Sequence, residues 1–388
     1  MRTASIVAEA QPTVAERSAS SARIVAIDAL RGVALILMAL DHSAFFVGAG
    51  LQAESYGGQP VVLQSAAYWL SGLLTNLASP IFFFLGGYSL ALYAAAQARR
   101  GQPLQATTRF MLIRALVILM LDLTICAWFW RGATPYVHVL TSIAAAMIIL
   151  AGLRHLLAPR QIGIVAIITL LIHQAWIGWM ASDLAADAPQ SFWQAFWLTY
   201  SYDTKPAIGF AVLGWGPLLW LGYALGHWQD HPALRQPRRW AQIGVGLLIL
   251  WLVLRLIGGF GDLGPFRAIG DSPAHLLIMS KAPPSLSYFA FNLGIAALIL
   301  AWAYATPQLF TTGWLRWLPM VGQVSLFFYV AHIIIYHLIA LGLSQLPLSG
   351  PRIIWGYSAW LIGLVVLVPL GYWYRRQRKQ HQRVLGYL

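Results

Sequence analysis

The chain has 388 residues, of which 59% are hydrophobic and only 10% are charged, and its formal net charge is +13. Soluble globular proteins carry roughly 25% charged residues, so this composition excludes an ordinary soluble domain and indicates a polytopic membrane protein. Basic loops and anionic lipid headgroups explain the positive charge, so we do not expect a nucleic acid partner.

The chain divides into a polar start, a long apolar body and a basic end. Residues 1–22 lack the apolar core of a signal peptide, so we expect a disordered cytoplasmic tail. Residues 23–374 form a single transmembrane domain, and residues 375–388 form a basic tail suited to lipid headgroups. The predicted fold is all-α, with about ten transmembrane helices of the length that a bilayer requires. These helices cover about 24–47, 73–96, 109–130, 135–153, 161–181, 207–228, 240–260, 286–305, 319–343 and 352–374.

The distribution of lysine and arginine predicts the orientation, because cytoplasmic loops carry an excess of both residues. With the N-terminus inside, most of these residues gather on one side of the predicted helices, so we expect both termini in the cytoplasm. The three longest gaps, about 48–72, 182–206 and 261–285, then lie on the outer side. A substrate site that faces outward would be built from these gaps.

The first predicted helix carries four titratable groups in the run "IDALRGVALILMALDHS". Arg31 and His42 are 11 residues apart, which places them on nearly one helix face and about 16 Å apart along the axis. Asp28 lies one turn before Arg31 and is placed to pair with it, whereas Asp41 points away from His42. Charged groups at this depth are functional candidates. The alternatives are a structural ion pair for Asp28 and Arg31, and a histidine that only hydrogen-bonds a neighbouring helix.

Later helices add two catalytic candidates. Asp122 lies in the middle of the third helix, where a carboxylate is costly unless it is paired or protonated. It would pair with Arg255, hold a histidine, or serve the structure alone. His138 opens the fourth helix at its outer end, level with His42, and the alternative is an interfacial histidine.

The run "SKAPPSLSY" begins the eighth helix on the outer side, where its two prolines suit a helix start. Lys281 and Ser285 would bind an anionic or hydroxylated ligand there, or Lys281 would only anchor the helix at the membrane interface. His332 and His337 are five residues apart and point to different faces, so they are poor joint metal ligands. No metal-binding motif occurs, and we expect no metal.

The run "IDALRGVALILMALDH" resembles the opening helix of the heparan-alpha-glucosaminide N-acetyltransferase catalytic-domain family of bacterial membrane proteins. It is also similar to the acyltransferase type 3 family, whose signature places an Arg eleven positions before a His, as Arg31 and His42 are placed here. Further runs resemble the first family in the expected order: "SPIFFFLGGYSLAL", "YVHVLTSIAAAMIILAGL", "GWGPLLWLGYALGHW", "SKAPPSLSY" and "VGQVSLFFYVAHIIIYH".

The resemblance implies a membrane enzyme that moves an acyl group, usually acetyl from acetyl-CoA, to a sugar or similar acceptor across the membrane. It also implies a histidine at the transfer centre. Lysosomal members carry an Asn near the position of His42 and a catalytic His in the first luminal loop, but the loop 48–72 has no His here. His42 is therefore the expected base, and Arg31, supported by Asp28, would hold acyl-CoA on the cytoplasmic side.

The expected partners are acyl-CoA, membrane lipids and a carbohydrate-type acceptor, at the cytoplasmic (inner) membrane, with a homodimer left open. A different class, a proton-coupled transporter or a lipid- or sugar-handling protein, would use Asp122, His42 and His138 as a proton relay. In a third class, a structural or assembly protein, the polar groups only pair helices. Thiol release from acyl-CoA favours the enzyme, and proton-coupled uptake without an acyl donor favours the transporter.

Overall fold

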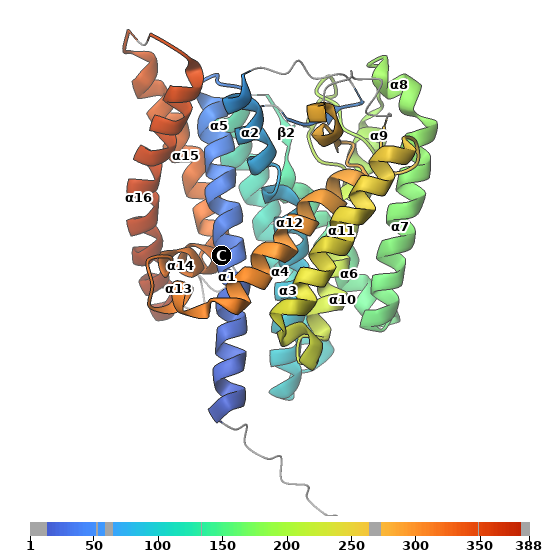
Figure 1. Ribbon diagram of the computed structural model, residues 1–388, viewed down its shortest axis with the longest axis vertical. Helices are drawn as coiled ribbons and strands as arrows, with labels where there is room; N and C mark the ends of the chain where they lie inside the picture. Colours follow the sequence, from blue (N-terminus) through green and yellow to red (C-terminus); the bar gives the residue numbers. More distant parts are fainter. Residues whose placement is uncertain are drawn as a thin grey trace, which may run out of the picture.

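The computed structural model describes residues 14–51, 53–58, 65–132, 134–263, 273–347 and 349–381. Most of these residues are helical, and long helices run side by side through the molecule (Figure 1). Eight helical segments in the described part are long and apolar enough to cross a membrane. They are Ala66–Arg99, Leu104–Arg131, Val139–Leu156, Pro159–Trp179, Pro237–Ile257, Leu286–Ala305, Ser325–Ser344 and Arg352–Gln380. The protein is therefore a mostly helical integral membrane protein.

In the described part of the chain, the elements follow one another as sixteen α-helices with short π, 3₁₀ and β segments between them. The bounds are α1 Val14–Phe46, β1 Ser55–Tyr56, α2 Ala66–Thr75, α3 Ala78–Arg99, α4 Leu104–Leu121, η1 Asp122–Cys126, α5 Ala127–Arg131, β2 Tyr136–Val137, α6 Val139–Leu156, α7 Pro159–Trp179, α8 Ala181–Ala185, α9 Phe192–Trp197, β3 Ala207–Ile208, α10 Val212–His227, η2 Pro232–Arg235, α11 Pro237–Ile257, η4 Pro273–Leu277, β4 Ser280–Ala282, α12 Leu286–Ala305, α13 Pro307–Thr311, α14 Trp317–Gln323, α15 Ser325–Ser344 and α16 Arg352–Gln380.

Each of the ten predicted helices has a helical counterpart, although α1 and α10 are not among the eight segments that meet the length and composition of a span. A count of ten spans therefore stays a prediction. The segment predicted as one helix over 319–343 is divided at Val324 into α14 and α15. The disordered tail predicted for 1–22 is wrong for residues 14–22, because α1 already begins at Val14. Extending an existing helix adds one hydrogen bond per residue without a new nucleation cost. Residues 1–13 and 382–388 lie outside the described residues.

The helix α1 lies centrally, in contact with α3, α12, α14, α15 and α16. Its closest partner is α14, because a side chain on Gly32 would collide with the carbonyl of Leu318 and one on Gly322 with the carbonyl of Asp28. Small residues at such contacts let two helix backbones approach closely. This crossing holds the segment of α1 that carries Asp28 and Arg31 against α14.

Two parallel strand pairs join segments that are far apart in the chain. β1 pairs with β4, with Ser55 opposite Ser280, and β2 pairs with β3, with Tyr136 opposite Ala207. The pairs lie at the end of the bundle where Figure 1 shows α2, α8 and α9. The first pair joins the first and third long connections of the chain, and the second pair joins the segment after the second long connection to the segment before α6.

The same connections also pack directly on one another. Gly57 lies against Leu184 and Tyr200, and Gly58 lies against Leu263. The expectation that the three long gaps gather at one end is thus confirmed as a matter of packing. Which side of the membrane this end faces stays a prediction, and we call it the outer end below.

Candidate functional site

One cavity of about 840 Å³ extends between the helices and carries polar groups at both of its ends. Arg31 and His42, which the helical spacing places on nearly one face of α1, both line it. The helical rise separates them by about 16 Å along the axis. Between them the wall is apolar, and it includes Met38, Phe82, Leu90, Ile143 and Met147.

At the inner end, Arg31 is held by the residues around it. Its Nη1 donates to Asp28 Oδ1 at 2.9 Å, and its Nη2 donates to Ser89 Oγ at 2.6 Å. The other oxygen of Asp28 accepts from Gln323 Nε2 at 3.0 Å. The predicted Asp28–Arg31 pair is therefore confirmed, and Asp28, which is buried, acts behind Arg31 and not on the cavity surface.

Two further guanidinium groups line this end, and sequence reasoning missed both. Arg114 comes from α4 and lies near enough to Arg31 and Arg378 for their charges to interact. Arg378 comes from the end of α16 and donates to the carbonyl oxygen of Gln323 at 3.0 Å. Asp28 pairs with Arg31, and Arg114 and Arg378 add two more guanidinium groups to the inner end. No local sequence signal marks this cluster, because its members come from three distant helices.

Near the outer end, His42 meets a second histidine that the sequence had not linked to it. His42 Nδ1 lies 2.6 Å from His332 Nε2, and His332 Nδ1 lies 3.1 Å from the carbonyl oxygen of Phe328. The indole ring of Trp130 packs edge-on against His42, with the ring centroids 4.5 Å apart. His42 is thus buried, with His332 and Trp130 packed against it, and it lines the cavity.

His138 lies beside His42, as its predicted depth requires. Their ring centroids are 6.4 Å apart, and both rings line the cavity. His138 Nδ1 lies 3.2 Å from the hydroxyl oxygen of Tyr329. The cavity therefore brings two imidazoles and a phenol to one place, which is a suitable set for proton transfer and for binding a polar substrate.

Asp122 acts on the backbone, not on an imidazole. Its Oδ2 accepts hydrogen bonds from the backbone N–H of His138 at 3.1 Å and from the N–H and hydroxyl of Thr141 at 2.8 and 2.7 Å. These contacts satisfy N–H groups at the start of α6 that no helical carbonyl can reach. The carboxylate is fully buried and is not among the described residues that line the cavity. The partner considered for it, Arg255, pairs with Asp262 at 2.5 Å.

The outer end carries an ion pair beside a further carboxylate. Lys281 Nζ lies 2.9 Å from Glu54 Oε1, and the pairing of β4 with β1 brings these residues together. Burial alone would lower the pKa of Lys281, but the carboxylate of Glu54 together with nearby tyrosine and aspartate groups raises it well above its ordinary value. Asp41 also lines the cavity and accepts a hydrogen bond from Thr75 at 3.2 Å. Asp41, which the helical spacing directs away from His42, thus also reaches the cavity.

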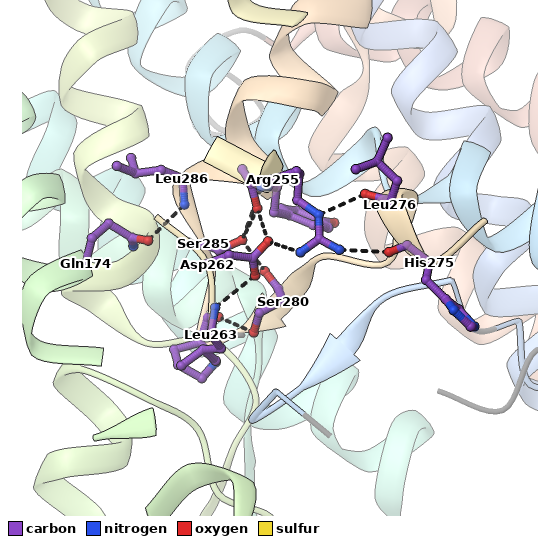
Figure 2. Close-up of polar contacts among 12 residues, drawn as sticks. Gln174, Arg255, Asp262, Leu263, His275, Leu276, Ser280, Ser285 and Leu286 are labelled. Carbon is purple, nitrogen blue, oxygen red and sulfur yellow. Dashed lines mark hydrogen bonds and ion pairs between the residues drawn. The ribbon is translucent and has the colours of Figure 1, made fainter. Parts of the chain in front are cut away.

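Ser285 is fully buried at the start of α12, apart from the cavity. Its hydroxyl oxygen accepts from the backbone N–H of Tyr288 at 3.1 Å and so caps the helix. Figure 2 shows it in a buried polar cluster centred on Arg255 and Asp262, where Arg255 also donates to the carbonyl oxygens of His275 and Leu276. This cluster fixes the segment that carries Lys281.

Residues 23–256 match the family model described as "Heparan-alpha-glucosaminide N-acetyltransferase, catalytic". The match covers most of the chain and includes Arg31, His42, Asp122 and His138, but it ends before Lys281. Comparison with curated proteins gives no match. Because the match extends over more than half of the chain, the chain belongs to the heparan-alpha-glucosaminide N-acetyltransferase catalytic-domain family.

Proposed function

We propose that the protein is a membrane acetyltransferase that takes its acyl group from acyl-CoA on the cytoplasmic side. It passes that group to a hydroxyl or amine of a sugar-like acceptor at the outer end of the cavity. The observation that carries this proposal is one cavity that has Arg31, Arg114 and Arg378 at one end and His42 near the other. Membership of the family supports the transferase class.

The inner end suits the nucleotide part of acyl-CoA. Arg31, Arg114 and Arg378 supply guanidinium groups to the cavity, and guanidinium groups bind phosphate well through paired hydrogen bonds. The apolar wall beyond them suits the pantetheine arm, which is long and flexible. A donor bound in this way places its thioester near His42, about 16 Å further along α1.

At the outer end, His42 would act as the general base. Its Nε2 takes the proton of the acceptor hydroxyl or amine as that group attacks the thioester carbonyl carbon. The carbon–sulfur bond breaks, the acyl group joins the acceptor as an ester or an amide, and the proton passes to the sulfur of CoA. The alternative is that His42 accepts the acyl group first and then gives it to the acceptor.

The other polar groups would bind and orient the reactants. Asp41 faces the cavity and is placed to accept a hydrogen bond from a hydroxyl or an amine. Lys281 and Glu54 form part of the same wall. Asp122 would act indirectly, because it holds the backbone of His138 and the start of α6 in place.

The test uses purified protein in liposomes loaded with a mixture of sugar and amino sugar acceptors, with acetyl-CoA added outside. Release of free thiol together with acetylated acceptor inside the liposomes is the expected result. Thiol release without acetylated acceptor reduces the proposal to a hydrolase. A transporter would instead take up the acceptor with protons when no acyl donor is present, and it would release no thiol when acetyl-CoA is added. That pair of results would overturn the proposed enzyme function.

A second measurement separates the two routes of transfer. Protein quenched in acid during turnover is digested, and the peptide that contains His42 is examined by mass spectrometry. An acetylated peptide in wild type, absent from His42→Gln, supports transfer through the histidine. An unmodified peptide under the same conditions supports direct transfer.

A further inference from the structure

The hydrogen bonds around His332 determine which of its ring nitrogens carries the proton. The carbonyl oxygen of Phe328 can only accept, so His332 Nδ1, 3.1 Å away, carries a hydrogen. In the neutral ring the other nitrogen, Nε2, then has a lone pair. This lone pair faces His42 Nδ1 at 2.6 Å, so His42 Nδ1 must be the donor.

The geometry fits a hydrogen bond better than a stacking contact. The ring centroids are 4.9 Å apart and the planes differ by 21°, while the nearest nitrogens are only 2.6 Å apart. The two imidazoles therefore meet edge to edge and nearly in one plane, as a directed N–H···N bond requires. His332 is fully buried in the middle of α15, where its orientation is fixed by packing.

The opposite assignment is unfavourable. If His42 carried its proton on Nε2, lone pairs on His42 Nδ1 and His332 Nε2 would face each other at 2.6 Å. A second proton on His332 would remove that repulsion only by placing a positive charge in a buried site. His332 thus biases His42 toward the form that is protonated on Nδ1 and has a free lone pair on Nε2.

We propose that His332 is a positioning residue that fixes the tautomer and ring orientation of His42, so that the Nε2 lone pair of His42 is presented to the cavity. The inference deepens the proposed function. The effect of His332 on the rate of acyl transfer rests on that function, whereas its effect on the tautomer of His42 does not. As the reaction proceeds, His42 gains a proton on Nε2, and the hydrogen bond from its Nδ1–H to His332 stabilises the resulting imidazolium. His332 itself need not touch either substrate.

The first experiment is independent of activity. Protein labelled with ¹⁵N-histidine is examined by NMR in lipid nanodiscs, and the signals of His42 are identified by their loss in His42→Gln. Wild type is expected to show a protonated Nδ1 and an unprotonated Nε2. In His332→Ala the balance should move toward the Nε2–H form, and His332→Gln, whose side-chain oxygen can accept from Nδ1–H, should restore the wild-type form. His337→Ala is the matched control, because His337 lies on the same helix and contacts the rings of Phe46 and Phe129 instead.

The second experiment measures transfer. We expect His332→Ala to lower kcat on the order of 10²-fold, with little change in the KM for acetyl-CoA, and His332→Gln to recover much of that loss. An unchanged His42 tautomer in a folded His332→Ala overturns the inference, as does an unchanged kcat. Should wild type show no transfer while the tautomer still depends on His332, the proposed function fails and the positioning role stands. If His332→Ala does not fold, His332→Gln becomes the test. The inference then requires that His42 in His332→Gln carries its proton on Nδ1, and a proton on Nε2 overturns it.

Discussion

The two ends of the cavity are built in different ways. At the inner end, guanidinium groups project from long helices, and the Asp28–Arg31 pair is made within one turn of α1. At the outer end, connecting segments also enter the wall, because Glu54 and Lys281, 227 positions apart, come from the chain around the β1–β4 pair and lie in the same cavity as His42. An end built from helix faces suits a constant ligand such as a nucleotide, whereas an end built from connecting segments can vary with the acceptor.

Of the changes that test the difference between the two ends, substitution of His42 at the outer end is expected to have the largest effect. His42→Ala removes the base, and we expect kcat for acetyl transfer to fall about 10²- to 10⁴-fold while the KM for acetyl-CoA stays within a few-fold. Thiol release at saturating acetyl-CoA measures it. His337→Ala, which changes a histidine that does not line the cavity, should retain wild-type kcat. Equal loss in both variants would show that the change acts through the fold and not through the chemistry.

The outer ion pair is expected to have the next largest effect, on stability. Lys281→Met leaves the buried carboxylate of Glu54 unpaired and should lower the free energy of unfolding by about 3–5 kcal/mol. The double variant Lys281→Met with Glu54→Gln removes both charges and should recover most of that loss. Denaturant unfolding in detergent measures all three variants. A double variant as unstable as Lys281→Met alone would show that packing of the lysine stem, and not the charge pair, carries the effect.

The same pair predicts a dependence on pH. A lysine whose pKa is raised in the folded state contributes stability below its unfolded pKa, and this contribution is lost as the pH rises through the folded pKa. Since the folded pKa is well above the ordinary value, the stability difference between wild type and Lys281→Met should stay constant from about pH 7 to 10. A difference that declines within this range would show that Glu54 does not hold the lysine in its charged form.

A smaller and more selective effect is expected at the inner end. Arg378→Gln removes one guanidinium from the cavity and should raise the KM for acetyl-CoA about tenfold, with kcat little changed. The matched control is Arg376→Gln, because Arg376 is exposed on the same helix and does not line the cavity. With S-acetylpantetheine, which lacks the nucleotide phosphates, Arg378→Gln and wild type should react alike. A similar loss with both donors would place Arg378 away from the phosphates.

The inner end could be predicted from sequence to the extent that it lies within one helix. Helical spacing alone placed Arg31 and His42 on one face and paired Asp28 with Arg31, and apolar runs located the helices. The contributions of Arg114, Arg378 and His332 depend on which helices pack together, and one sequence carries no such information. The same limit explains Asp41, which points away from His42 on α1 and still reaches the cavity.

The smallest effect concerns Ser285, where the two kinds of role can be separated most clearly. If the hydroxyl only caps α12, Ser285→Ala should cost about 1 kcal/mol of unfolding free energy and leave the KM for acetyl-CoA and for the acceptor unchanged. Ser285→Asp keeps a capping oxygen but adds size and negative charge near Asp262. It should be less stable than Ser285→Ala, because the cluster already holds a carboxylate. A KM that rises in Ser285→Ala without loss of stability would mean that the hydroxyl meets a ligand. The boundary of the site would then have to include the buried cluster of Figure 2, and Arg255 and Asp262 would become part of the acceptor end instead of its support.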